Sequence, residues 1–440
     1  MAAKLNPYKE YQTVAYDYTT KLPLGWQLLP NIAIFQERIE RGYINEDLLS
    51  VTIGRGVIKQ ADVDIKKDSS NEDKSKYKLI KVGDIAYNKM RMWQGALGYS
   101  DYQGISSPAY VILKPKLKIN PRYFHYMFRS SFYTNYSKRF SYGIVDDQLS
   151  LRYTDFKRMY SIVPPLEVQN SIVTYLDKKN NVIDKFIRNK ERLIELLEEQ
   201  KNEIINQAIV KGLNSNVKLK PSGVDWLGEI PINWEVNKLR YLGSFQNGVS
   251  AGAEYFGSGY PFISYGDVYN NSILPSDILG LAKSSKEDRK RFSVMEGDVF
   301  FTRTSETIEE IGFSSISWNT IENAIFSGFL IRFRHSKNLL FKGYSKYYFK
   351  SNLHRRYFVK EMNLVTRASL SQELLKNLAV LLPTLKEQEE ISSFLDKKLT
   401  HINQIIIKAR QEITSIKEYR EAIITAAVTG QINLTDPNQK

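Results

Sequence analysis

The strongest constraint on the fold is an apolar pattern that occurs twice, 219 residues apart. The first copy consists of Ile172, Leu176, Ile183, Ile187, Ile194, Leu197 and Ile204, and the second of Ile391, Leu395, Ile402, Ile406, Ile413, Ile416 and Ile423. The spacings of three, four and seven residues place each set on one face of a long helix with about 3.5 residues per turn. The pattern therefore predicts two long helices that pair as a coiled coil.

Both predicted helices have sequence signals at their ends. Proline precedes or opens each one, at Pro165 and Pro383, and Thr384 with Glu387 forms a capping-box pattern at the second start. Each ends at a glycine, Gly212 or Gly430, as expected for a left-handed C-terminal cap. The 48 residues from Pro165 to Gly212 predict a rod of about 70 Å.

A domain-sized stretch precedes each helix, so the chain is predicted to contain two copies of one unit. Apolar runs at 110–113 and 329–333 and Gly-Asp turns at 83–85 and 297–299 predict strands in corresponding places. Residues 121–136 and 344–359 are expected to be helical. We therefore expect a mixed α/β (α+β) fold with pseudo-two-fold symmetry. The expected segments are a first domain at 1–163, a first helix at 164–213, a linker and second domain at 214–382, a second helix at 383–432 and a tail at 433–440.

Composition favours a nucleic-acid partner. Of the formal charge of +14, residues 1–163 carry +9 and residues 221–382 carry +3, while the second helical segment is neutral. Basic globular domains favour a polyanion, and a chain with two-fold character suits duplex DNA. The chain has no cysteine, which excludes disulfides, zinc fingers and thiol nucleophiles. Without a secretory or membrane-spanning pattern, the protein is expected in the cytoplasm.

No motif for independent catalysis stands out. Asn6-Pro7-Tyr8 lacks the second proline of an adenine methyltransferase loop, and the chain has no phosphate-binding P-loop. The four histidines show no spacing typical of metal ligands or of a catalytic triad. We therefore expect no catalytic residue, no metal and no cofactor on this chain.

Several motifs resemble specificity subunits of type I restriction–modification systems. Residues 223–234 (GVDWLGEIPINW) resemble the motif that opens their target recognition domains, and residues 22–26 (LPLGW) form a shorter counterpart. The starts of both helices, at 165–177 and 384–396, resemble the family's helix starts, although Val168 replaces a usual Glu and Thr384 a usual proline. Residues 88–98 and 301–305 also resemble recurrent loops of these domains, so the likeness covers essentially the whole chain.

This resemblance implies a non-catalytic DNA-binding subunit. Each globular domain would read one half of a bipartite target in double-stranded DNA, and two antiparallel helices would set the spacing. The helices would dock two methylation subunits and, through them, ATP-dependent restriction subunits that translocate and cut DNA. S-adenosylmethionine, ATP and Mg²⁺ would bind those partners, in a bacterial or archaeal cell. A coiled-coil architectural protein that binds DNA without sequence preference is the alternative.

Residues that contact DNA are expected on loops, because Arg, Lys and Gln side chains can reach base edges or phosphates there. Candidates in the first domain are Arg55, Lys59, Lys89, Arg91 and Gln94. Candidates in the second domain are Arg303, Thr304, Ser305 and Arg367. Trp93 is expected to pack in the core or within its loop, and not to insert between bases.

Overall fold

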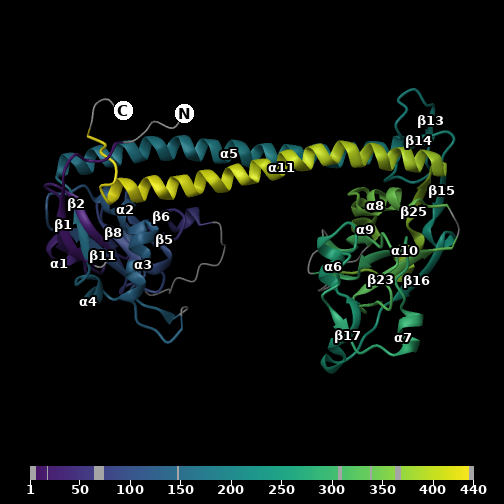
Figure 1. The fold of residues 1–440 in the computed structure, drawn as a ribbon, viewed down its shortest axis with the longest axis horizontal. Helices are drawn as coiled ribbons and strands as arrows, with labels where there is room; N and C mark the ends of the chain where they lie inside the picture. Colours follow the sequence, from purple (N-terminus) through teal and green to yellow (C-terminus); the bar gives the residue numbers. More distant parts are fainter. Residues whose placement is uncertain are drawn as a thin grey trace. The chain divides into compact units, whose positions relative to one another are not determined.

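The computed structural model describes residues 6–16, 18–63, 74–145, 148–305, 310–336, 339–361 and 368–435. The chain forms two compact units, residues 1–190 with 410–440 and residues 191–409. Each unit combines one globular domain with about half of each long helix (Figure 1). The units therefore cut across the segment boundaries expected from the sequence, which stay a prediction.

Short strands and helices make up the first unit. Its strands are β1 (Tyr11–Tyr16), β2 (Thr19–Pro23), β3 (Gln27–Pro30), β4 (Phe35–Glu37), β5 (Leu49–Thr52), β6 (Gly56–Lys59), β7 (Lys78–Ile80), β8 (Ile85–Asn88), β9 (Leu97–Tyr99), β10 (Gly104–Ser106), β11 (Tyr110–Pro115) and β12 (Tyr160–Val163). Its short helices are α1 (Asn31–Ile34), α2 (Pro121–Arg129), α3 (Ser131–Arg139) and α4 (Tyr153–Phe156). The long helix α5 (Leu166–Lys211) begins here.

The second unit repeats this mixture. Its strands are β13 (Leu219–Pro221), β14 (Glu229–Pro231), β15 (Glu235–Lys238), β16 (Gly243–Asn247), β17 (Phe256–Ile263), β18 (Leu281–Ala282), β19 (Val299–Thr302), β20 (Thr304–Ser305), β21 (Ser314–Ile316), β22 (Ile325–Phe326), β23 (Leu330–His335), β24 (Ala368–Ser369) and β25 (Ala379–Leu382). Its short helices are α6 (Tyr265–Asn270), α7 (Lys286–Arg291), α8 (Lys342–Lys350), α9 (Leu353–Glu361) and α10 (Gln372–Asn377). The second long helix is α11 (Leu385–Val428).

A four-stranded antiparallel sheet lies at the centre of each unit. The strand order is β4-β11-β8-β9 in the first and β16-β23-β19-β21 in the second. Val111 pairs with Tyr87 in one sheet, and Ile331 pairs with Phe301 in the other. The matching order confirms the predicted duplication, and the expected strands at 110–113 and 329–333 are β11 and β23.

The two Gly-Asp turns begin the central strands β8 and β19, as predicted. Asp84 and Asp298 are 2% and 1% exposed. Each accepts a backbone N–H bond that closes its turn, from Lys81 at 2.8 Å or Met295 at 2.8 Å. Each also pairs with an arginine, Arg38 or Arg334. Because a buried carboxylate needs a charged partner, these pairs fix where the central strands start.

Two helices pack beside each sheet where the sequence predicts one helical stretch. In the first unit the stretch is divided at Ser130, whose backbone is extended (φ −65°, ψ 149°). Its hydroxyl donates to Met127 O at 2.5 Å, so it satisfies a carbonyl at the end of α2. Tyr123, Phe124 and Phe128 of α2 are buried in the core.

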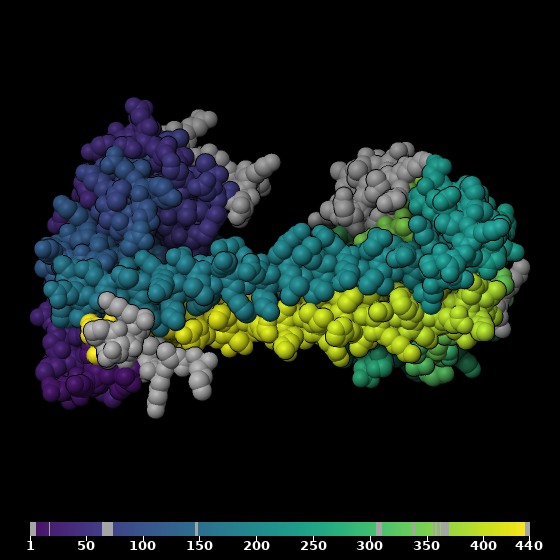
Figure 2. Space-filling model, turned by 90° about the horizontal axis from the view of Figure 1, so that it is seen from above, coloured from purple at the N-terminus to yellow at the C-terminus, as the bar shows by residue number. Residues whose placement is uncertain are grey.

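The long helices pair within each unit. In the first unit, Ile172 and Leu176 near the start of α5 share a core with Ile423 and Ala427 near the end of α11. In the second unit, Ile204 and Ala208 of α5 pack in one core with Ile391 and Leu395 of α11. The helices therefore run antiparallel, and both space-filling and ribbon views show them side by side (Figure 2).

The residues of the repeated apolar pattern form the seam between the two helices. They are buried or half-buried along both helices. Two ion pairs cross the helix pair in the first unit, Arg420 with Asp184 and Lys190 Nζ with Glu412 Oε2 at 2.6 Å. In the second unit, Lys201 pairs with Glu198 of its own helix. Apolar packing is thus shared by the two units.

The helix ends hold the globular domains in matching ways. The Tyr123 hydroxyl donates to Ile162 O and Val428 O, and the Tyr344 hydroxyl donates to Leu381 O and Ile209 O. Each tyrosine thus joins its own domain to the end of the other repeat's helix. Gly212 and Gly430 end the helices with φ of 72° and 74°, and Thr384 with Glu387 forms the predicted capping box.

Candidate nucleic-acid interface

Two basic candidates occupy equivalent positions in the two units. Lys89 directly follows β8, and Arg303 directly follows β19. The backbone N–H of Lys89 donates to Ala109 O at 3.4 Å, and that of Arg303 to Phe329 O at 2.9 Å. Their carbonyl oxygens accept bonds from the N–H groups of Leu151 at 2.9 Å and Leu370 at 2.7 Å. The fold thus presents one cation at the same end of each central strand.

A tight loop after Lys89 presents two more candidates. The Asn88 side chain accepts the Met90 N–H at 3.0 Å, and the Arg91 carbonyl accepts the Ala96 N–H at 3.0 Å. Met92 is fully buried and anchors the loop, while Arg91 and Gln94 are exposed. Partial burial and nearby Lys78 lower the pKa of the Lys89 ammonium. A phosphate would favour the charged form of this group again.

The candidates differ in whether their side chains already have hydrogen-bond or ion-pair partners within the protein. Within the described residues, no hydrogen bond or ion pair engages the side chains of Lys89, Arg91, Gln94 and Arg303. Arg55 instead donates to Asp62 O at 2.7 Å, and Lys59 lies 3.0 Å from the Asp47 carboxylate. The hydrogen bond from Lys59 to Asp47 raises the pKa of Lys59. Arg55 and Lys59 would have to exchange internal partners for DNA.

The second-unit loop is held by a short strand pair. Thr304 of β20 pairs with Ser369 of β24, and Thr304 O accepts the Tyr265 hydroxyl at 3.0 Å. Arg303 and Thr304 are half-buried. Ser305 belongs to β20, but its side chain lies outside the described part of the chain, as does the whole of Arg367.

Three residues beside the candidates escaped the sequence analysis. Exposed Arg152 directly follows Leu151 and is close enough to Lys89 to lower its pKa. Lys138 lies 4.9 Å from the centre of the Trp93 ring, whose Nε1 donates to Met90 O at 3.2 Å. Trp93 therefore packs within its loop, as expected. A basic residue beside a buried leucine is the only sequence signal that could have found Arg152.

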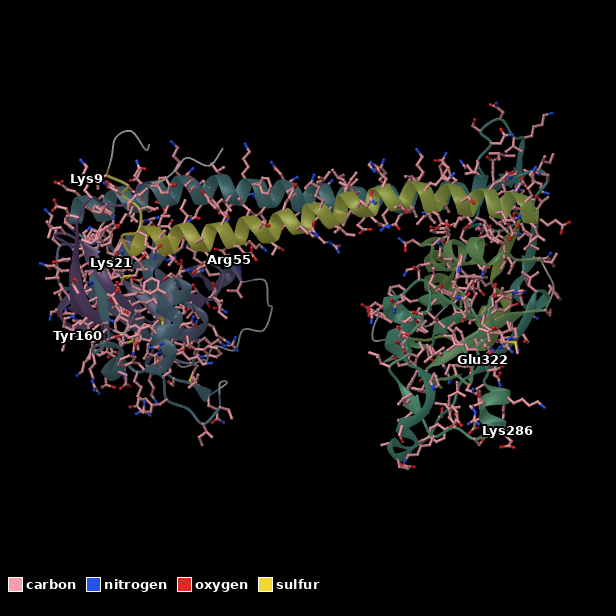
Figure 3. All side chains as sticks on the ribbon, in the orientation of Figure 1. Lys9, Lys21, Arg55, Tyr160, Lys286 and Glu322 are labelled. Atoms are coloured by element: carbon pink, nitrogen blue, oxygen red, sulfur yellow. The ribbon has the colours of Figure 1, made fainter. Side chains whose placement is uncertain are left out.

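Arg129 is the third missed residue, and it supports the turn that carries Arg55. Its guanidinium donates to the carbonyl oxygens of Ile53 at 2.7 Å, Gly54 at 2.8 Å and Leu97 at 3.0 Å. Burial lowers its pKa, which nearby Glu421 partly offsets. Figure 3 labels Arg55 on the turn that Arg129 holds.

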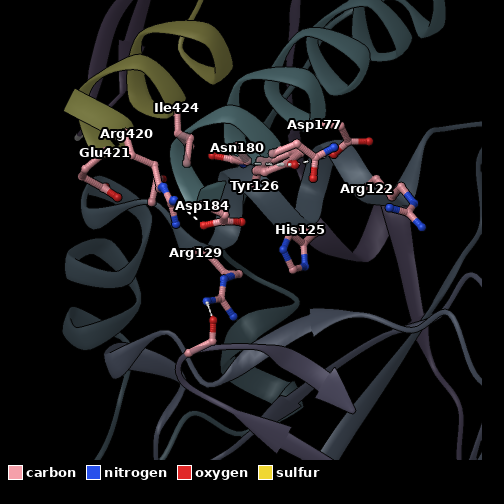
Figure 4. A pocket seen from close by; sticks show the side chains of 13 residues that line it. Arg122, His125, Tyr126, Arg129, Asp177, Asn180, Asp184, Arg420, Glu421 and Ile424 are labelled. Carbon is pink, nitrogen blue, oxygen red and sulfur yellow. Dashed lines mark hydrogen bonds and ion pairs between the residues drawn. The ribbon is translucent and has the colours of Figure 1, made fainter. Parts of the chain in front are cut away.

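A polar cavity of about 520 Å³ lies where the first domain meets the helix pair (Figure 4). Its charges have partners: Asp184 pairs with Arg420, Asp177 accepts the Tyr126 hydroxyl, and Glu421 accepts the Ser131 N–H. Burial lowers the pKa of His125 to about 3, so its imidazole is neutral and accepts the Tyr99 N–H through Nδ1 at 3.1 Å. The cavity is thus a structural junction.

The second unit has a smaller cavity, of about 400 Å³, beside α7. Its lining includes Lys286, Arg289 and Lys290 together with Glu322. Arg289 already donates to Ser284 O and lies over the Tyr260 ring, 3.7 Å from its centre. In the described part of the chain, no cluster of His, Asp or Glu side chains could hold a metal ion. None of the helices described there is long and apolar enough to cross a bilayer.

Comparison with known proteins finds a matching family model and several similar relatives. A family model described as "Type I restriction modification DNA specificity domain" matches residues 231–417. The putative type I restriction enzyme MjaX specificity subunit of Methanocaldococcus jannaschii is 25% identical over 411 residues, which cover 89% of each chain. The type I restriction enzyme EcoKI specificity subunit of Escherichia coli is 23% identical, over 73% of this chain and 68% of its own.

Solved structures share the fold. A chain from a structure of "complex assembly and conformational transition of the type I R-M system" has a TM-score of 0.72 at 16% identity, covering 94% of this chain and 100% of its own. The HsdS subunit of Thermoanaerobacter tengcongensis has a TM-score of 0.51 at 17% identity, over 96% and 100% of the two chains. In its duplicated units, its antiparallel helices and its matched relatives, the chain is similar to the specificity subunits of type I restriction–modification systems.

Proposed function

We propose that each globular domain reads one half of a split DNA target, with Lys89 in the first domain and Arg303 in the second at the centre of the contact. The equivalent placement of these two cations, both free of partners among the described residues, carries the proposal. An arginine can bond two acceptors of guanine in the major groove, and a lysine can bond one base edge or a phosphate. Different side chains at one position would read different half-sites.

Neighbouring groups would share the contact. Arg91 and Gln94 lie on the Lys89 loop, and Thr304 and Ser305 follow Arg303. Arg55, Lys59 and Arg367 remain candidates. Arg55 and Lys59, which would first have to exchange their internal partners, suit phosphate contacts better, because such contacts do not require base recognition.

The long helices would set the distance between half-sites. At about 1.5 Å per residue, the 46 residues of α5 and the 44 of α11 give rods of roughly 70 and 65 Å. Because the two helices pack along their apolar faces, they resist bending better than a single helix would. The length of the gap between half-sites would therefore follow from the number of helical residues.

The outer faces of the helices would bind the partner subunits. In the first unit Val182, Phe186 and Tyr419 are 64%, 36% and 41% exposed, and in the second Ile407 is 55% exposed. Exposed apolar side chains on a helix typically mark a protein interface. We propose that two methylation subunits dock there and bind S-adenosylmethionine. Restriction subunits that use ATP and Mg²⁺ would join through them, in the cytoplasm of a bacterial or archaeal cell.

Sequence-specific binding is favoured over the architectural alternative. The matched relatives are specificity subunits, and the two units present different side chains at equivalent positions. An architectural protein would gain nothing from this difference, because phosphate contacts alone carry no sequence information.

The experiment compares Lys89→Ala with Arg303→Ala in the complex reconstituted with its methylation subunits. Binding is measured on duplexes mutated in one half-site at a time, after the target has been mapped by methylation. Loss of a base contact should reduce discrimination at one half-site by about 1–3 kcal/mol and leave the other unchanged. Lys21→Ala is the matched control, because this exposed lysine of β2 lies over Tyr11 (Figure 3). Equal weakening on every duplex would reassign the residue to a phosphate, and no effect would refute its role.

A further inference from the structure

A turn held by a serine side chain precedes β11 in the first unit and β23 in the second. The Ser107 hydroxyl accepts the Ala109 N–H at 3.2 Å, and the Ser327 hydroxyl accepts the Phe329 N–H at 3.2 Å. In each turn the serine carbonyl also accepts the N–H of the third residue after it, at 3.0 Å. The two units therefore present Ala109 and Phe329 on the same kind of turn.

These two residues lie directly opposite the two candidate cations. The antiparallel register of β19 with β23 continues to Arg303, whose N–H donates to Phe329 O at 2.9 Å. In the first unit, the Lys89 N–H donates to Ala109 O at 3.4 Å. Opposite residues of antiparallel strands send their side chains to the same side of the sheet, with Cβ atoms about 5 Å apart. Each unit thus pairs a cation with the residue across from it.

The residue across from the cation differs between the units. Ala109 is exposed and carries only a methyl group, whereas Phe329 carries a phenyl ring and is 63% exposed. Single exposed apolar residues are common on protein surfaces. This ring, however, lies next to an arginine that is a candidate for base recognition, so it is available to the same ligand.

The backbone that carries the ring is held by a neighbouring loop. The Gly328 N–H donates to Val249 O at 2.7 Å, and the Val249 N–H donates to Phe326 O at 2.8 Å. A Cβ added to Gly328 would collide with the Ser250 hydroxyl and lie 3.0 Å from Val249 O. Because this close approach fixes the turn before any ligand binds, a contact by Phe329 costs little conformational entropy of the backbone.

An arginine beside an aromatic ring matches two neighbouring base pairs in the major groove. Guanine offers two acceptors that an arginine can bond, and thymine offers its C5-methyl group, which a phenylalanine can contact. Successive base pairs are about 3.4 Å apart, which is close to the roughly 5 Å between opposite Cβ atoms. Arg303 and Phe329 can therefore reach adjacent base pairs.

We propose that Phe329 is a second base-reading residue of the second unit, and that its ring contacts the methyl group of a thymine next to the base read by Arg303. The inference rests on the proposed function, because it needs Arg303 to face DNA. Ala109 leaves the equivalent position of the first unit without a ring. A change of one side chain opposite the cation is then sufficient to change the sequence that a unit recognises.

The test combines Phe329→Ala with removal of single methyl groups from the DNA. Each thymine of either strand in the mapped second half-site is replaced in turn by deoxyuridine, which lacks only the C5-methyl group. One replacement should weaken binding by the unmodified reconstituted complex about fourfold, the effect of one buried methyl group. Phe329→Ala should weaken binding to the thymine duplex roughly tenfold and make the complex insensitive to that replacement.

Two controls separate this contact from general effects. Tyr241→Ala removes a ring of similar exposure, 62%, just before β16, whose first residue pairs with His335 at the other end of β23. This variant should bind every duplex as the unmodified complex does. Deoxyuridine in the first half-site should have the same effect with and without Phe329→Ala. Because neither substitution changes a charge, the slope of log affinity against log salt should stay constant.

Three results would overturn the proposal. The first is a second half-site with no thymine next to the base whose recognition Arg303→Ala impairs. The second is equal sensitivity to deoxyuridine in the unmodified and Phe329→Ala complexes. The third is loss of methylation subunits from the Phe329→Ala complex in native mass spectrometry, which would make the ring a protein contact.

The same measurements distinguish failure of this inference from failure of the proposed function. If Arg303→Ala also leaves binding to the second half-site unchanged, this face of the second unit does not read DNA and both proposals fail. If Arg303→Ala impairs recognition of that half-site while Phe329→Ala has no effect, only the contact between the ring and thymine fails.

Discussion

The two units share their strand order and their contacts between domain and long helix, but they carry different side chains at the ends of equivalent strands. Each has the same four-strand order, and each binds its domain to its own long helix through one tyrosine and one aspartate, Tyr126 with Asp177 or Tyr347 with Asp396. A buried glutamine at the start of each long helix, Gln169 or Gln388, accepts a backbone N–H from its domain at 2.8 Å.

The differences lie at the strand ends and loops. Lys89 stands where Arg303 stands in the other unit. The groups that hold the domains are thus repeated, whereas the groups available to DNA vary. A duplicated chain can change what it recognises in one unit while its assembly geometry stays the same.

The largest expected effect tests the buried ion pairs that start the central strands. Asp84→Ala removes the buried partner of Arg38, whose side chain is 7% exposed and keeps only the partly exposed Glu40, so the free energy of unfolding should fall by about 3 kcal/mol. Asp298→Ala should cost less, because the Arg334 side chain is 25% exposed and can reach water. Thermal unfolding would measure the loss of stability in both variants. Hydrogen exchange would show which of the two units is destabilised. Equal losses would mean that exposure of the arginine does not govern the cost.

A smaller effect tests the tyrosines that join each domain to the far helix end. Tyr123→Phe removes hydrogen bonds of 3.0 and 3.3 Å, and should lower the free energy of unfolding of its unit by about 1–2 kcal/mol. Tyr344→Phe removes longer bonds, of 3.3 and 3.4 Å, so its loss should be smaller. Hydrogen exchange at the helix ends, near Val428 and Ile209, would compare them. A larger loss in Tyr344→Phe would contradict the ranking.

The smallest effect concerns the pH dependence of the cap at the start of the second long helix. Burial acts to raise the pKa of Glu387, but hydrogen bonds from Thr384 outweigh it and lower the pKa below the usual 4.5. The cap should therefore contribute fully above about pH 4.5 and fade as pH falls through the lower folded value. Glu387→Gln should cost about 0.5–1 kcal/mol at pH 7 and remove this acid dependence. Val168 holds the equivalent position in α5, so Val168→Thr should show no such dependence.

Much of the frame could be predicted from the sequence because it depends on local patterns. The repeated seam, the Gly-Asp turns and the Thr384 capping box each require only neighbouring residues. The division at Ser130 was missed, because the hydroxyl that satisfies the Met127 carbonyl competes with the helix only once α2 has packed.

The site was less predictable because partners come from distant segments. Arg55 and Lys59 looked as free as Arg91 in the sequence, yet Asp62 O and the Asp47 carboxylate occupy them. Arg129 looked like an ordinary helix-ending arginine, although it holds a turn more than 70 residues away. Such pairings depend on the folded arrangement of the side chains, which spacing along the chain does not encode.

The central claim, that two reading domains are held apart by helices that measure DNA, is tested most directly by lengthening the helices. One heptad is inserted between Glu191 and Glu198 of α5 and one between Arg410 and Lys417 of α11, which keeps the seam in phase. Seven residues add about 10 Å, or roughly three base pairs at 3.4 Å each. Genome-wide methylation by the reconstituted variant complex should show the same half-site bases with a gap about three base pairs longer. An active variant that methylates sites with the original gap would contradict the claim.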